Sequence, residues 1–70
     1  MLITVPNKAK YEHLKEGDLI ALTENDRFLG YATVYSKASD TLILDADKKI
    51  WQTLYRLISE DIPFSFDIGY

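Results

Sequence analysis

Hydrophobic and polar residues are arranged in short β-type runs over the first two thirds of the chain. Residues 2–5 (LITV) predict a strand that ends at Pro6, because proline cannot donate to a β-ladder. The runs 18–24 (DLIALTE) and 28–36 (FLGYATVYS) flank the polar residues 25–27 (NDR) and predict a hairpin. A second turn at 37–40 and the run 41–46 (TLILDA) extend this hairpin to an antiparallel meander.

Helical periodicity replaces this pattern in two places. Residues 7–18 predict one or two helical turns that stop at Gly17, since glycine commonly follows a helix end. Residues 47–60 predict a helix of about 12 residues lying against the sheet, with Asp45 or Asp47 as its N-cap. Its apolar stripe consists of Ile50, Leu54, Leu57 and Ile58, flanked by Trp51 and Ile62. We expect Trp51 to be largely buried between helix and sheet.

The C-terminal segment PFSFDIGY returns to a period of two. Phe64, Phe66, Ile68 and Tyr70 alternate with Ser65, Asp67 and Gly69, which predicts a half-buried strand with its apolar side facing the core. We expect this strand to pair with residues 2–5 and to bring the two termini together. An open edge there would also allow a second copy to pair and form a homodimer. The alternative is a flexible docking peptide.

These elements predict an α+β fold in a single unit covering residues 1–70. The expected architecture is a small, strongly curved antiparallel sheet, or an SH3-like or OB-like barrel, of about five strands with one main helix in the C-terminal half. Gly30, inside the second meander strand, suits a bulge or a close approach of another element.

Composition narrows the functional classes. The chain has no cysteine, no signal-peptide pattern at its start and no apolar run near the ~20 residues needed to cross a bilayer. We therefore expect a cytoplasmic protein without membrane contact. No Walker loop, nucleophile elbow or dinucleotide glycine pattern occurs, and His13 is the only histidine. We expect neither enzymatic activity nor a cofactor or metal.

The charges are unevenly distributed, with eleven acidic and eight basic side chains. Two segments hold acids without a base: residues 16–26, with Glu16, Asp18, Glu24 and Asp26, and residues 57–70, with Glu60, Asp61 and Asp67. At the predicted helix, Lys48 and Lys49 stand at the N-terminal end and Glu60 and Asp61 at the C-terminal end. The helix dipole favours the reverse, at typically 0.3 to 1 kcal/mol for each charge. Local helix stability therefore does not explain these charges. One interpretation is solvated helix ends whose true bounds differ by two or more residues from the predicted ones, and the other is an acidic patch of Glu60, Asp61 and Asp67 that faces a basic partner surface.

Tyr31 and Tyr35 share one face of a predicted strand, opposite Phe28, Ala32 and Val34. If this tyrosine face is exposed, it offers a contact surface. We therefore expect a non-catalytic protein whose acidic and aromatic face engages a basic surface of another protein, as small accessory or inhibitory factors of phage and mobile elements do. The expected partner-binding residues are Glu60, Asp61, Asp67, Glu24, Asp26, Tyr31 and Tyr35.

The alternative is a small β-barrel that binds RNA or single-stranded DNA. In this interpretation the tyrosines stack on bases, and Lys37 with Lys48 or Lys49 contacts phosphates. The net charge of −3 disfavours binding that depends on phosphate neutralisation.

Overall fold

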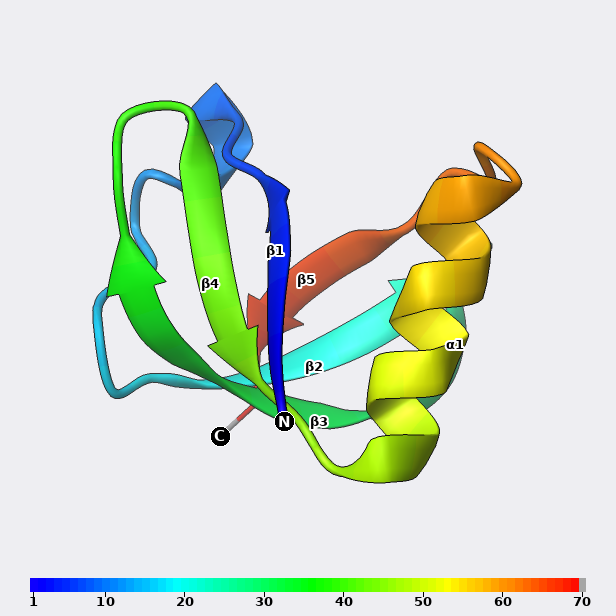
Figure 1. Cartoon of the computed structure of the whole chain (residues 1–70). Helices are drawn as coiled ribbons and strands as arrows, with labels where there is room; N and C mark the ends of the chain where they lie inside the picture. Colours follow the sequence, from blue (N-terminus) through cyan, green and yellow to red (C-terminus); the bar gives the residue numbers. More distant parts are fainter. Residues whose placement is uncertain (70) are drawn as a thin grey trace.

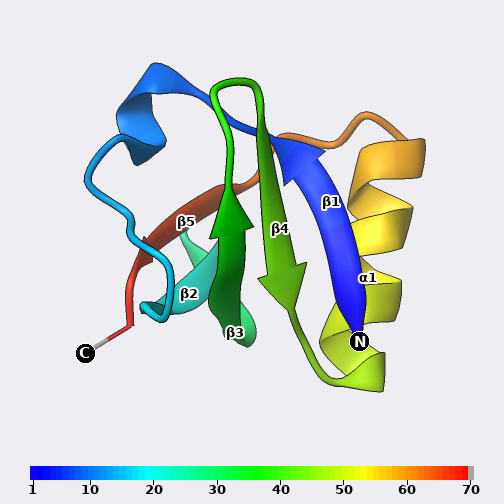
Figure 2. The same cartoon turned by 60° about the vertical axis from the view of Figure 1, so that its left-hand side comes forward.

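A computed structural model describes residues 1–69 and shows an α+β fold with a five-stranded antiparallel sheet (Figures 1 and 2). The strand order is β1-β4-β3-β2-β5. The elements are β1 (Leu2–Pro6), the 3₁₀ turn η1 (Ala9–Tyr11), β2 (Leu19–Glu24), β3 (Arg27–Lys37), β4 (Thr41–Asp45), α1 (Lys48–Ser59) and β5 (Ser65–Ile68).

The predicted hairpin and meander are confirmed. β2 pairs with β3, and β3 pairs with β4, both antiparallel. The turn between β2 and β3 consists of Asn25 and Asp26, whose φ angles are 55° and 65°. Two left-handed residues produce the backbone twist that a two-residue hairpin needs, and Asn and Asp tolerate this conformation better than most residues.

The expected pairing of the C-terminal strand with β1 is wrong. β5 pairs with β2, from Thr23↔Ser65 to Ile20↔Ile68, whereas β1 pairs with β4 at the other end of the sheet. The two outer strands are therefore separate free edges, and the sheet is neither closed nor strongly curled, so the expected barrel is also wrong. Figure 2 shows the N-terminus well separated from the end of β5, so these two parts of the chain do not meet.

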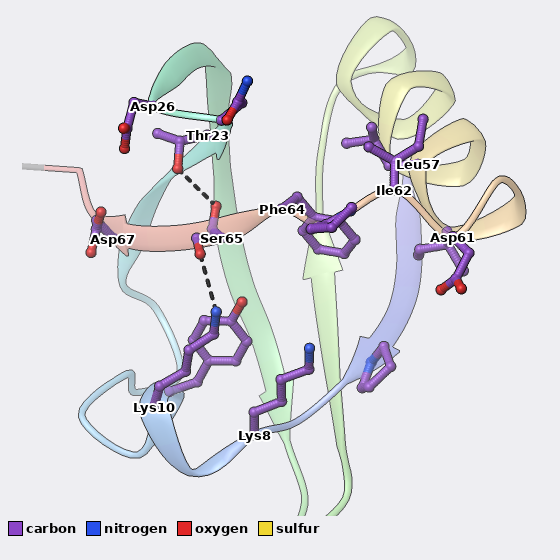
Figure 3. A pocket seen from close by; sticks show the side chains of 15 residues that line it. Lys8, Lys10, Thr23, Asp26, Leu57, Asp61, Ile62, Phe64, Ser65 and Asp67 are labelled. Carbon is purple, nitrogen blue, oxygen red and sulfur yellow. Dashed lines mark hydrogen bonds between the residues drawn. The ribbon is translucent and has the colours of Figure 1, made fainter.

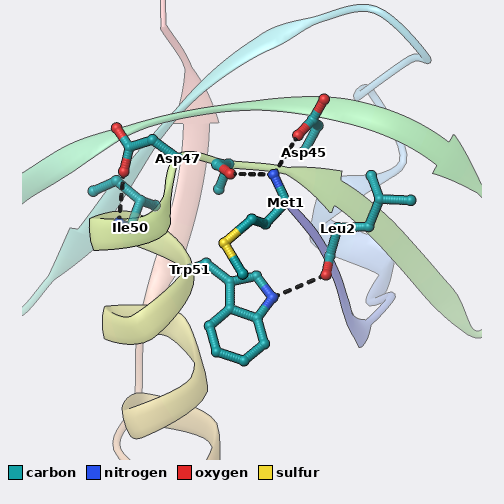
Figure 4. Close-up of polar contacts among 7 residues, drawn as sticks. Met1, Leu2, Asp45, Asp47, Ile50 and Trp51 are labelled. Carbon is teal, nitrogen blue, oxygen red and sulfur yellow. Dashed lines mark hydrogen bonds and ion pairs between the residues drawn. The ribbon is translucent and has the colours of Figure 1, made fainter.

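Helix α1 has the predicted length of 12 residues and the predicted buried stripe. Asp47 is the N-cap, since its carboxylate accepts a hydrogen bond from the Ile50 N–H at 2.8 Å. The other candidate cap, Asp45, instead accepts from the Met1 amino group at 2.9 Å (Figure 4). Ile58 is exposed, because the helix turns that edge of its stripe away from the sheet.

One face of the sheet packs against α1 and the segment between β1 and β2. The core consists of Ile3, Val5, Tyr11, Leu14, Ile20, Leu22, Ala32, Val34, Leu42, Leu44, Ala46, Ile50, Leu54, Leu57 and Phe66. Gly30 allows a close approach, as expected: a Cβ atom there would lie 2.3 Å from Cδ1 of Ile50. The helical turns predicted to stop at Gly17 are reduced to the single 3₁₀ turn η1, which ends at Tyr11, and Gly17 instead lies in a separate turn with a left-handed φ of 92°.

Trp51 is only partly buried, in contrast to the expected position between helix and sheet. Its indole N–H donates to the Leu2 carbonyl at 2.9 Å, so the ring lies where α1 meets the free edge of β1 (Figure 4). The ring also stacks on Tyr55, with 5.3 Å between the ring centroids. This contact occupies the Leu2 carbonyl, and Pro6 has no N–H, so both reduce the backbone groups that β1 offers to another strand.

The C-terminal strand is only partly as predicted. Phe66 is buried and Phe64 packs against the core, but Ile68, the last residue of β5, is exposed although it pairs with the buried Ile20. Tyr70, the last residue of the predicted alternation, lies outside the described residues.

Candidate functional site

Three aromatic side chains are exposed on strand β3. Phe28 is 53% exposed, Tyr31 50% and Tyr35 58%. The tyrosines lie opposite the buried Ala32 and Val34, as the alternation predicts. The position of Phe28 differs from the prediction that it faces the core.

A β-bulge explains the position of Phe28. Leu22 pairs with Gly30 and Thr23 pairs with Phe28, so Leu29 has no direct partner on β2. The additional residue reverses the alternation on its N-terminal side, which places Phe28 on the same face as Tyr31. The two rings are in edge contact, with centroids 5.0 Å apart. A bulge of this kind leaves no sign in the hydrophobic pattern.

We call the side of the sheet that carries these aromatic residues the outer face. Side chains that lie opposite one another on neighbouring strands form rows across this face. One row is Asp67–Ala21–Tyr31, and a second is Ser65–Thr23–Phe28. A third row crosses the sheet through Leu19, Thr33, Asp45 and Leu2. Among residues 1–69, the charged side chains in these rows are the carboxylates Asp67 and Asp45, with no basic side chain.

The ring of Tyr31 is held in place by its neighbours. A Cβ atom at Gly69 would lie 3.1 Å from Cδ1 of Tyr31 and 3.2 Å from Cγ of Leu19. Because Gly69 bonds through its N–H to the Leu19 carbonyl at 2.9 Å, the ring of Tyr31 must extend from β3 across β2 towards the end of β5. Phe28 supports the ring on its other side. Gly69 has no side chain and therefore makes room for the ring of Tyr31.

An open groove of about 640 Å³ follows the free edge of β5 (Figure 3). Pro6 and Lys8 lie on one side and the end of α1 on another, with Leu57, Ile62 and Phe64 supplying apolar lining. Three of the predicted partner-binding acids, Asp26, Asp61 and Asp67, line it. Lys8 and Lys10 line it as well, so the groove carries both signs of charge.

Two of these three acids occupy backbone positions that favour glycine. Asp26 has a φ of 65°, and Asp61 has a φ of 56° just after the C-cap residue Glu60. The Ile62 N–H donates to the Leu57 carbonyl and the Asp61 N–H to the Ile58 carbonyl, which is the Schellman pattern of helix ends. Glycine is usual at the left-handed position of this pattern. A carboxylate there is also unfavourable towards the helix dipole.

The other predicted acids are spread more widely. Glu60 is the exposed C-cap residue of α1 and Glu24 the last residue of β2, and neither lines the groove. Glu16 and Asp18 precede β2, at the opposite end of that strand from Asp26. The Asp18 carboxylate accepts from the Lys15 N–H at 2.9 Å. The acids of residues 16–26 therefore do not form one patch.

The lysines assigned to nucleic-acid contacts are also separated. The Lys37 ammonium donates to the carbonyls of Tyr11, Glu12 and Leu14 at 3.3, 2.8 and 2.8 Å, so it holds the segment around η1. Lys48 and Lys49 begin α1, on the other side of the sheet from Tyr31. The reversed helix-end charges are confirmed by the observed helix bounds.

Part of the free edge of β5 is covered by the segment around η1. Tyr11 packs against Phe66, with ring centroids 5.4 Å apart, and the Lys10 ammonium donates to the Ser65 hydroxyl at 3.1 Å (Figure 3). Burial raises the pKa of the Tyr11 hydroxyl, and hydrogen bonding with the Phe66 backbone offsets part of the rise.

Residues 1–69 contain no group of three or more histidine, aspartate or glutamate side chains placed to hold a metal ion. Within the same range, no helix has the length and apolar character to cross a membrane. Comparisons with protein-family models, with curated proteins and with solved structures give no significant match.

Proposed function

We propose that this protein is a non-catalytic binding protein that uses its acidic and aromatic surface to engage a basic surface of another protein. The observation that carries the proposal is the outer face, where Phe28, Tyr31 and Tyr35 are half exposed and the charged side chains of the rows are the carboxylates Asp67 and Asp45. Exposed aromatic side chains grouped on one face are typical of protein interfaces, where aromatic residues are enriched.

Charge supports the same partner class. The chain has a net charge of −3, and Asp26 and Asp61 line the groove beside the outer face at positions where glycine would be more favourable. Rim carboxylates accelerate association with a basic partner and make it sensitive to salt. A small accessory or inhibitory factor, of the kind that phage and mobile elements encode, fits a chain of this size with these surfaces.

The test compares the wild-type chain with a variant carrying Tyr35→Ser and Asp67→Lys as baits for crosslinking in the native host. The matched control carries Tyr55→Ser and Glu16→Lys, since Tyr55 is as exposed as Tyr35 but lies on α1. Circular dichroism shows that each bait is folded. The proposal predicts a protein partner whose purified complex weakens with the first variant, weakens with rising salt, and persists with the control.

Two outcomes would contradict the proposal. Equal capture by both variants would remove the outer face from the interface. Capture that disappears on nuclease treatment would support the alternative, a protein that binds RNA or single-stranded DNA, in which the exposed tyrosines stack on bases.

A further inference from the structure

The row Asp67–Ala21–Tyr31 has the composition of a site for a planar cation. An aromatic ring attracts a cation to its face, and a carboxylate pairs with it at the side. Neighbouring strands are about 4.8 Å apart, so Asp67 and Tyr31, two strands apart, are separated by roughly 10 Å at their Cα atoms. Ala21 lies between them and has only a methyl group, so no side chain on β2 fills the space above the row.

The ring of Tyr31 borders this space. Its extension across β2 towards Gly69 brings it towards the part of β5 that carries Asp67, two residues earlier on the same face. Half of the Tyr31 side chain remains exposed, and its ring is in edge contact with Phe28. Tyr31 and Asp67 therefore stand on the same face of the sheet, on either side of Ala21.

We propose that the space between Tyr31 and Asp67 binds an arginine side chain of the basic partner. This inference rests on the proposed function and names the chemical group that the outer face takes. A guanidinium group is planar, so it can lie on the phenol ring while its N–H groups donate to the carboxylate. A lysine ammonium has no flat face with which to stack.

Charge complementarity supports this occupant over a second copy of the chain. The rows of the outer face carry the carboxylates Asp67 and Asp45, and Asp45 is already paired with the Met1 amino group. The nearby cations of a second copy, the Met1 amino group and the Lys10 ammonium, are already bonded to Asp45 and Ser65 within their own chain, so a second copy offers Asp67 no free cation in these rows. A partner segment with arginine supplies the missing charge.

Three hexapeptides test the site: hexa-arginine, hexa-lysine and hexa-citrulline. Each is titrated into the full chain, and binding is followed by two-dimensional NMR. Citrulline has the shape of arginine without its charge. We expect hexa-arginine to bind more tightly than hexa-lysine, hexa-citrulline not to bind, and the largest shifts to occur at the Tyr31 ring and the Gly69 amide. Equal affinity for the two cationic peptides would overturn the arginine assignment.

Matched variants distinguish binding at this site from non-specific electrostatic attraction between a cationic peptide and an acidic protein. Tyr31→Leu keeps the apolar surface but removes the ring, and should weaken hexa-arginine binding roughly 2- to 30-fold, whereas Tyr31→Phe should retain it. Asp67→Asn should weaken binding more than Asp61→Asn, which removes the same charge at the end of α1. Gly69→Ala should also weaken binding, because its new methyl group displaces the ring.

The outcome distinguishes this site from the broader proposal. If Tyr31→Leu and Asp67→Asn bind hexa-arginine as tightly as the wild type, while the host partner is still lost with Tyr35→Ser and Asp67→Lys together, the arginine site is wrong and the protein-binding function stands. If the host partner is retained by that double variant as well, both proposals fail. Circular dichroism excludes unfolding as the cause in each variant, and Tyr31→Phe shows that the position accepts substitution.

Discussion

At the scale of single residues, Gly30 allows the sheet and the helix to approach closely. A Cβ atom at Gly30 would lie 2.3 Å from Cδ1 and 3.0 Å from Cγ1 of Ile50, and Ile50 is buried. Gly30→Ala should therefore lower the free energy of unfolding by about 1 to 3 kcal/mol, the usual cost of overpacking. Urea denaturation measures this change.

A second substitution tests that explanation. Ile50→Val removes Cδ1, the atom nearest to the added methyl group. The double variant Gly30→Ala with Ile50→Val should be more stable than the sum of the two single effects predicts, because each change relieves the other. Simple additivity would show that the cost comes from the strand backbone and not from this contact.

Tyr11 makes the folding stability of the protein depend on pH, and the stability should fall as the pH rises. Burial raises the pKa of its hydroxyl above the ordinary value of 10.0, so the folded state holds this proton more tightly than the unfolded state does. The contribution of the protonated Tyr11 hydroxyl to folding stability is fully present below pH 10 and is lost as the pH rises through the raised pKa. Between about pH 9 and pH 11, the wild type should lose more stability than Tyr11→Phe in urea denaturation. Parallel losses would contradict this.

Residue patterns predicted burial correctly from Tyr31 to Tyr35 of β3. Ala32 and Val34 are buried opposite Tyr31 and Tyr35, as alternation requires. Phe28 breaks the pattern because one bulged residue, Leu29, reverses the faces, and bulges depend on the partner strand. The candidate site could not be predicted from the sequence for a similar reason. Asp67 and Tyr31 flank Ala21 only because of the register between strands that lie far apart in the sequence.

At the scale of elements, Lys37 holds the segment between β1 and β2 in place. Its ammonium donates to three backbone carbonyls, of Tyr11, Glu12 and Leu14. Lys37→Met keeps the aliphatic part of the side chain but removes these bonds, so it should cost about 1 to 3 kcal/mol. Hydrogen exchange should increase at the amides of residues 11–18.

The matched control is Lys15→Met, which removes the same charge from an exposed position in the same segment. We expect it to change the free energy of unfolding by less than about 0.5 kcal/mol, as is usual for surface substitutions. Equal effects of the two substitutions would show that net charge, and not the bonds to the three carbonyls, determines stability here.

Local sequence determined the elements but not their order in the sheet. The helix at Lys48–Ser59 and the hairpin around Asn25 and Asp26 follow from periodicity and turn chemistry, which act over a few residues. Strand order depends on which long-range contacts complete the core. β5 joins β2 because Phe66 then meets Leu22 and Tyr11, a combination that no short window of sequence contains.

At the scale of the whole molecule, β5 closes the core although it lies at an edge of the sheet. Phe66 is 3% exposed and Phe64 packs beside it. A chain that stops at Ile62 should lose cooperative unfolding, because losing buried aromatic residues costs ~3 kcal/mol or more each in a domain with only about 5 to 15 kcal/mol of net stability. A cooperative thermal transition in circular dichroism would contradict this prediction.

Point variants of the same strand give the control for the truncation. Phe66→Ala should cost about 3 to 5 kcal/mol, whereas Ile68→Ser, at an exposed position of β5, should stay within about 1 kcal/mol. Similar effects of both substitutions would mean that pairing with β2, and not burial of Phe66, provides the stabilisation.

The fluorescence of Trp51 reports whether α1 is packed against the sheet. Trp51 is the only tryptophan, its indole is bonded to Leu2 of β1 and stacked on Tyr55, and β1 is the edge of the sheet farthest from β5. Its fluorescence should therefore shift towards that of hydrated indole when α1 leaves the sheet and stay constant when a ligand occupies the outer face. A single emission spectrum can thus separate a variant that has lost its fold from one that has lost only its ligand.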